Sequence, residues 1–217
     1  MAASMLCIFD LDGTLYRSAS SFLPTMHRIY DAFGVPRASD EEILAQVGET
    51  YTTFIEWLMP QGFPGDIEEL GGRITEIELA SIRDHGQLFA GVDTGLRRLR
   101  DRGIAIALCT NGDRRYAEFV LNTHGILPLF DEIQTNDDDR RVKTEMVAAL
   151  LEQFQARQAV VIGDRYHDME AGLANGCTTV GAAYGYARPG ELKAATYVIK
   201  AFSDLLGIVD ALASTHA

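Results

Sequence analysis

The sequence predicts an α/β protein with a parallel sheet core and an inserted all-helical cap domain. Short apolar runs typical of buried strands alternate with stretches of helical periodicity, and this alternation favours a parallel sheet. The segment between the first two strands is far longer than the roughly 30 residues of a βαβ unit, which indicates an insertion. At 217 residues, the chain can hold a core and a smaller companion domain.

Each strand of the core is predicted from an apolar run that turn or polar residues close. The predicted strands are 5–9, 104–109, 159–162, 178–180 and 196–199. Between them, apolar residues recur at three and four positions, which is the helical period. The predicted core helices are 90–102, 114–124, 144–155 and 203–213.

The insertion between the first two strands has helical patterns broken by Gly and Pro, and it contains no convincing strand. We therefore expect a helical cap domain at 15–88. The core domain is then formed by residues 1–14 and 89–217.

Composition and charge exclude several classes of protein. The chain is 47% hydrophobic and 23% charged, as in ordinary soluble proteins, and its net charge of −12 disfavours a nucleic-acid partner. No apolar run reaches the roughly 18 residues of a membrane span, and the N-terminus lacks the features of a secretory signal. We expect a cytoplasmic protein without a membrane partner.

The cysteines are too far apart in sequence for a CxxC site, and the histidines lack zinc-ligand spacing.

Polar residues follow three of the predicted strands, where open parallel sheets bind ligands. They are Asp10 and Asp12 after the first strand, Thr110, Asn111 and Gly112 after the second, and Gly163, Asp164 and Asp168 after the third. Lys143 stands at the start of a predicted helix, where a cation opposes the helix dipole and gains nothing locally. The sequence therefore predicts a polar site at one edge of the sheet.

Each feature has a simpler alternative by itself. Asp164 and Asp168 could cap a helix, Thr110 with Asn111 could form an ordinary turn, and a lone surface lysine is common. Together they would bring four carboxylates to one place, which requires a compensating cation. Oxygen ligands without Cys or His select a hard ion, and Mg²⁺ is the expected cofactor.

In this order the motifs resemble those of the haloacid dehalogenase-like hydrolase superfamily. The matching strings are DLDGT at 10–14, TNG at 110–112, Lys143 and GDRYHD at 163–168, so the resemblance spans the chain. FAGVDTGLRRLRDRG and MEAGLANGCTTVGAAYGY resemble the phosphoglycolate phosphatase branch, which has a helical cap after the first motif. The resemblance implies a Rossmann-like core.

The resemblance further implies a Mg²⁺-dependent phosphatase that acts on a small soluble phosphate monoester, phosphoglycolate-like or another phosphorylated metabolite. Asp10 would be the nucleophile that forms an aspartyl-phosphate, and Asp12 would be the general acid and base. Lys143 would bridge Asp10 and the phosphate. The phosphate would be held by Thr110 and the amides of Asn111 and Gly112.

The same resemblance implies the metal ligands and leaves the substrate open. Mg²⁺ would be held by Asp10, the backbone carbonyl of Asp12 and Asp164, with Asp168 orienting its shell. We expect Arg17 and the loop 48–53, with Thr52, to face the active site from the cap and to contact the leaving group. The alternative for Arg17 is a position at the surface of the hinge.

Proteins with other functions share this core. A phosphosugar mutase of the β-phosphoglucomutase type would need the cap to grip a second phosphate, and the cap arginines leave this open: Arg17, Arg28, Arg37, Arg73 and Arg83. A phosphonoacetaldehyde hydrolase would need a cap lysine, but the first lysine of the chain is Lys143. A non-catalytic phosphate-binding regulator is the remaining alternative, and the intact motifs argue against it.

Overall fold

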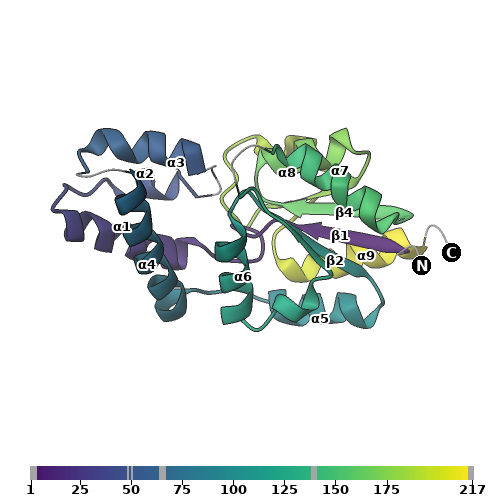
Figure 1. The fold of residues 1–217 in the computed structure, drawn as a ribbon. Helices are drawn as coiled ribbons and strands as arrows, with labels where there is room; N and C mark the ends of the chain where they lie inside the picture. Colours follow the sequence, from purple (N-terminus) through teal and green to yellow (C-terminus); the bar gives the residue numbers. More distant parts are fainter. Residues whose placement is uncertain (1–3, 48, 50, 64–66, 138–140, 215–217) are drawn as a thin grey trace.

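One parallel sheet organises the molecule (Figure 1). The computed structural model describes residues 4–47, 49, 51–63, 67–137 and 141–214. The six strands lie in the order β3-β2-β1-β4-β5-β6, and every neighbouring pair is parallel. Their bounds are β1 Met5–Phe9, β2 Ala105–Cys109, β3 Glu132–Gln134, β4 Gln158–Gly163, β5 Thr178–Ala182 and β6 Tyr197–Ile199. The predicted α/β fold with a parallel core is confirmed.

Two features of the sheet differ from the prediction. The edge strand β3 was not predicted, because only Ile133 of its three residues is buried and no apolar run marks it. β5 continues beyond Val180 through Gly181 and Ala182, where the small Gly181 lets the side chain of Leu192 pack closely on the strand. Pairing with neighbouring strands, rather than hydrophobicity, decides both cases.

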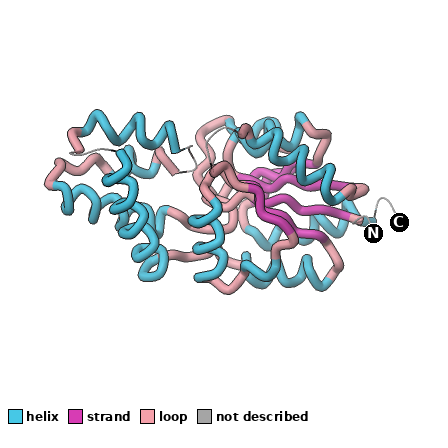
Figure 2. The backbone as a smooth tube through the Cα atoms, in the orientation of Figure 1, coloured by secondary structure: helices cyan, strands magenta, loops and turns pink. Residues whose placement is uncertain are grey.

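Helices cover both faces of the sheet (Figures 1 and 2). On one face, α5 (Val92–Asp101), α6 (Arg114–Thr123) and α9 (Leu205–Ser214) pack on Cys7 and Phe9 of β1. On the other face, α7 (Lys143–Phe154) and α8 (Tyr166–Ala174) pack on Leu6 and Ile8. Successive residues of β1 thus point to opposite layers, and all five are buried, as expected for a central parallel strand. The ends of the four predicted core helices lie within two residues of the observed ones.

The segment between β1 and α5 forms a helical unit with its own core. Its helices are α1 (Ala19–Phe33), α2 (Asp40–Leu44), α3 (Tyr51–Leu58) and α4 (Ile67–His85), with a short 3₁₀ turn at Met59–Gln61. A separate cluster that includes Met26, Ile29, Tyr30 and Leu58 packs between them. Its described residues contain no strand. In Figure 2 these helices lie beyond the ends of the strands, apart from the core helices.

Two chain segments connect this helical unit to the core, and they run side by side. Arg17 N–H donates to the carbonyl of Gln87 at 2.8 Å, and Phe89 N–H donates to that of Leu15 at 3.0 Å. Tyr16 and Leu88 form an antiparallel bridge between these bonds. The predicted boundaries of the cap, 15 and 88, fall within this paired segment, and we propose that it is the hinge between core and cap.

The remaining short elements are the 3₁₀ turns Leu127–Leu129, Glu191–Ala194 and Phe202–Asp204. Among the described residues, no helix is long and apolar enough to cross a membrane.

Candidate active site

A cavity lies between the carboxyl edge of the sheet and the helical cap. Its volume is about 590 Å³, and residues of both parts line it. The core contributes Asp10 after β1, Thr110 after β2 and Lys143 at the start of α7. Because these segments all leave the same edge of the sheet, the parallel topology brings the predicted site residues together.

Three aspartates form a compact cluster, and two of them, Asp10 and Asp168, line this cavity. Asp10, Asp164 and Asp168 each offer a carboxylate oxygen, and these oxygens lie within 4.8 Å of one another. All three residues are buried. Lys143 Nζ donates to Asp10 Oδ1 and to Asp168 Oδ1, both at 2.6 Å, so a single buried ammonium links two of the carboxylates.

The electrostatics of the cluster are unbalanced. Burial raises the pKa of Asp10 to about 7, opposed by Lys143 and reinforced by the charge of Asp168. Burial and then the charges of Asp10 and Asp168 raise the pKa of Asp164 well above its usual range. Burial lowers the pKa of Lys143, but Asp10 and Asp168 outweigh this and raise it above the usual lysine value. Lys143 therefore stays charged, while one ammonium does not neutralise three carboxylates.

The cluster fits a divalent cation. Asp164 Oδ2 accepts a hydrogen bond from Tyr186 N–H at 2.5 Å, whereas Asp164 Oδ1 is buried and has no hydrogen-bond partner. A buried carboxylate oxygen without a partner is costly, and a hard cation among three carboxylates would satisfy it. Both carboxylate oxygens of Asp168 accept hydrogen bonds, Oδ1 from Lys143 and Oδ2 from Arg165 N–H at 3.0 Å.

Asp12 contributes no carboxylate oxygen to this cluster. Its Oδ1 accepts a hydrogen bond from the hydroxyl of Tyr116 at 2.6 Å. Burial raises the pKa of Asp12, although hydrogen bonds from Tyr116 and Ser18 lower it. A carboxyl with a raised pKa, at the cavity wall but apart from the three-aspartate cluster, is suited to proton transfer.

Two glycines allow the aspartates to lie this close. Gly13 has φ +81°, and a Cβ there would lie 2.1 Å from Asp164 Oδ2. A Cβ on Gly163 would lie 2.0 Å from Asp168 Cγ. Any side chain at either position would collide with a carboxylate, so the glycines of both aspartate motifs are required by the site itself.

The predicted phosphate-binding residues also line the cavity. Thr110, Asn111 and Gly112 form the loop between β2 and α6, whose N-terminal cap is Asp113. Gly112 N–H donates to Thr110 Oγ1 at 3.1 Å, which holds the loop in a tight turn. The loop thus lies at the N-terminus of a helix that begins at the cavity, which is where proteins commonly bind anions.

Comparison with known proteins decides the family. A family model described as "Haloacid dehalogenase-like hydrolase" matches residues 7–182. The chain belongs to this family. It is 27% identical over 198 residues to a phosphoglycolate phosphatase from Haemophilus influenzae (82% of this chain, 85% of that protein). It is 29% identical over 197 residues to one from Vibrio cholerae (86% and 87%).

Solved structures share the fold. One is described as a predicted phosphoglycolate phosphatase from Haemophilus somnus, with TM-score 0.80, 23% identity, and coverage of 96% of this chain and 99% of that one. Another, a putative β-phosphoglucomutase from Thermotoga maritima, has TM-score 0.78, 20% identity, and coverage of 95% and 98%. The predicted resemblance is confirmed. The family and the buried aspartates support a Mg²⁺-dependent phosphatase as the enzyme class.

Within this haloacid dehalogenase-like fold, one predicted cap residue lies elsewhere. Arg17 does not line the active-site cavity. It is exposed and lines a second cavity with Asp84 and Gln87. Its neighbours Tyr16 and Ser18 are buried, so in this extended segment the side chain between them points outward. The predicted position of Arg17 at the active site is therefore wrong, and the structure agrees with the alternative, an exposed arginine at the hinge.

The cap loop predicted at 48–53 does reach the cavity. Thr52 and Glu49 line it, whereas residues 48 and 50 lie outside the described residues. The role of Thr52 toward a leaving group stays a prediction.

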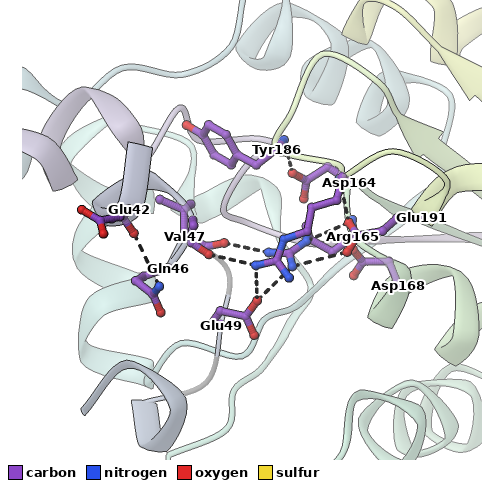
Figure 3. A network of polar contacts seen from close by, with 11 residues as sticks. Glu42, Gln46, Val47, Glu49, Asp164, Arg165, Asp168, Tyr186 and Glu191 are labelled. Carbon is purple, nitrogen blue, oxygen red and sulfur yellow. Dashed lines mark hydrogen bonds and ion pairs between the residues drawn. The ribbon is translucent and has the colours of Figure 1, made fainter. Parts of the chain in front are cut away.

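Arg165 was missed in the sequence, although it lies inside the motif GDRYHD. It is buried, and its guanidinium reaches across to the cap loop (Figure 3). Nη1 donates to the carbonyl of Val47 and Nη2 to Glu49 Oε1, both at 2.9 Å, while Nε donates to Glu191 Oε2 at 3.0 Å. Arg188 Nη2 also donates to Glu49 Oε1, at 3.1 Å. We refer to Glu49, Arg165, Arg188 and Glu191 as the cap–core latch.

Two further cavity residues were missed. Tyr116 lies in the first turn of α6, and its position just after the TNG motif could have indicated that it reaches the site. Glu78 lies on α4 of the cap and lines the same cavity. No local pattern marks Glu78, because only the docking of the cap on the core brings it there.

Proposed function

We propose that this chain is a Mg²⁺-dependent phosphatase that hydrolyses a small soluble phosphate monoester through an aspartyl-phosphate on Asp10. One observation carries the proposal: buried Asp10 is held by Lys143 at 2.6 Å within a three-aspartate cluster, while Asp12, two residues on, lies outside it. This separates an attacking carboxylate from a proton-transferring one.

In the first step, a carboxylate oxygen of Asp10 attacks phosphorus and the bond to the leaving alcohol oxygen breaks. Asp12 donates its proton to that oxygen, so the alcohol leaves neutral. Thr110 and the amides of the TNG loop hold the phosphoryl oxygens, and Lys143 orients Asp10 and offsets charge.

In the second step, a water attacks the phosphorus of the aspartyl-phosphate, and Asp12 takes a proton from it. Inorganic phosphate leaves, and the carboxylate of Asp10 is restored. The residues that would hold Mg²⁺ are Asp10, the backbone carbonyl of Asp12, Asp164 and Asp168. When bound, the ion supplies positive charge against the phosphoryl oxygens and the carboxylates.

The arrangement disfavours the mutase alternative. All five cap arginines lie within the described residues, and none lines the cavity. Arg37 pairs with Asp31, Arg73 lies over the ring of Phe33, and Arg28 pairs with Asp84. A second phosphate on the substrate would therefore meet no cap arginine. The substrate class that we propose is a small phosphorylated metabolite with one phosphate, in a cytoplasmic setting and without a nucleic-acid partner.

The test is hydrolysis of p-nitrophenyl phosphate and a panel of metabolite monoesters with Mg²⁺ and with EDTA. We expect Mg²⁺-dependent release of phosphate by the native protein and none above background by Asp10→Asn. Acid-quenched native protein should carry phosphate after reaction with a labelled ester, and Asp10→Asn should not. Equal turnover by the two proteins would refute the proposal and leave the regulator alternative.

A further inference from the structure

The charges of the cavity bear on what the leaving group can be. Among the described lining residues, the only lysine or arginine side chains are Lys143 and Arg165. Lys143 is bound to Asp10 and Asp168, and Arg165 is bound to Glu49 and Glu191. His167 also lines the cavity. Among the described lining residues, no lysine or arginine is thus left to receive an anionic group on the alcohol part of a substrate.

Glu78 lies on α4 of the cap and lines the same cavity as Asp10 and Asp12. It forms no hydrogen bond or ion pair with another described residue. The charged groups that act on it are the carboxylates of Asp12 and Asp113, both of the same sign. Burial first, and then these two charges, raise the pKa of Glu78 to about 8. A carboxyl in this setting is complementary to a cation supplied by the ligand, because an opposite charge nearby favours its ionised form.

Part of the cap wall is apolar. Phe22 and Phe54 meet edge to face with ring centroids 6.0 Å apart, and Met26 and Ile74 also line the cavity. Such a surface suits the methylene groups of a short alcohol, and aromatic faces attract an ammonium. It offers a carboxylate no lysine or arginine, so the charge of that group would lose hydration without gaining an ion pair.

We propose that Glu78 is a specificity-determining residue that selects phosphate monoesters of amino alcohols over monoesters whose alcohol part is anionic. This inference rests on the proposed phosphatase function and names its substrate class. The ammonium of the leaving alcohol lies against Glu78, its carbon chain lies on the apolar cap wall, and its phosphate lies at Asp10. Phosphoglycolate, whose alcohol carries a carboxylate, is then a poor substrate, in contrast to what the names of the relatives suggest for those proteins.

The test uses three esters of nearly equal size: 2-aminoethyl phosphate, 2-hydroxyethyl phosphate and phosphoglycolate. We expect kcat/KM to fall in that order, with at least about a tenfold difference between the first and the last, since tenfold corresponds to about 1.4 kcal/mol. In Glu78→Gln, the ratio of kcat/KM for 2-aminoethyl phosphate to kcat/KM for phosphoglycolate should fall at least about fivefold. Glu76→Gln is the matched control, because Glu76 is exposed on the same helix and does not line the cavity.

A binding measurement separates this inference from the function on which it rests. Calorimetry with Asp10→Asn and Mg²⁺ should show the same order of affinity for the three esters without turnover. The double variant Asp10→Asn, Glu78→Gln should bind the three esters without this preference. Equal or tighter binding of phosphoglycolate, or an order that Glu78→Gln leaves unchanged, would overturn the role of Glu78. Failure of native protein to hydrolyse any ester above Asp10→Asn would instead overturn the phosphatase proposal.

Discussion

Asp10 and Asp12 are only two positions apart in the sequence, yet they occupy different electrostatic environments. Asp10 lies against Lys143 in the carboxylate cluster, whereas Asp12 accepts a hydrogen bond from Tyr116 on the other side of the loop. Gly13 makes this turn possible through its positive φ. The division of roles between nucleophile and general acid is therefore a consequence of where the loop directs each side chain.

Asp12→Asn should affect the first chemical step in a way that depends on the leaving group. An alkyl alcohol needs a proton as it leaves, so its release should slow by roughly 10²–10⁴-fold. p-Nitrophenol leaves readily as an anion, so the burst of p-nitrophenol should slow much less. Rapid-quench measurement of the first turnover with the two esters gives this comparison.

The control for this experiment is Asp101→Asn, an exposed aspartate on α5 that lies outside the cavity. It should leave both rates unchanged. If Asp12→Asn slows the two esters by the same factor, Asp12 does not protonate the leaving group.

At the scale of elements, the sequence predicts the core better than the contacts between core and cap. The apolar runs of β1, β2 and β4 and the periodicity of α7 are local signals, and they predicted these elements to within a residue or two. β3 is too short and too polar on one side to give such a signal. The cap–core latch joins Arg165, directly after β4, to the loop that follows α2, and no local pattern specifies that pairing.

Glu49→Gln should loosen the docking of the cap. Glu49 is the shared partner of Arg165 and Arg188, and Arg165 is buried, so the loss of the carboxylate leaves part of its charge without a partner. We expect a loss of about 1–2 kcal/mol in stability, a higher KM, and faster hydrogen exchange in α2. Denaturant unfolding measures the loss of stability, and hydrogen-exchange mass spectrometry measures the faster exchange in α2.

Glu41→Gln, an exposed change on α2, is the matched control for the latch. It should alter neither KM nor exchange. Unchanged exchange and KM in Glu49→Gln would mean that the latch does not hold the cap.

At the scale of the whole molecule, the carboxylate cluster links folding, pH and metal. The pKa of Asp10 is raised to about 7, above the usual aspartate value of 3.8. A raised pKa means that protonation stabilises the folded state at low pH and that this contribution is lost as pH rises from about 4 to 7. A bound cation favours the ionised carboxylates, so its stabilising effect should grow over the same interval.

We therefore expect the rise in Tm caused by Mg²⁺ to increase from pH 5 to pH 7. At a hundredfold excess over Kd, ligand binding stabilises by about 2.7 kcal/mol, or roughly 5–10 °C for a chain of this size. Scanning calorimetry with and without Mg²⁺ at both pH values measures it. In the Asp164→Asn variant, Mg²⁺ should raise Tm much less than in the native protein. A shift that is equal at both pH values, or equal in the variant, would contradict the assignment of the metal site.

The sequence by itself determined the parallel core, the family and the order of Asp10, Thr110, Lys143 and Asp164 along one edge of the sheet. These follow from local periodicity and from the rule that parallel strands end at a common edge. The tertiary structure alone decided which cap residues reach the cavity: Arg17 points away from it, whereas Glu49 and Glu78 line it. The reason is physical: docking of two separately packed cores depends on contacts between residues far apart in the chain, and local sequence carries no signal for them.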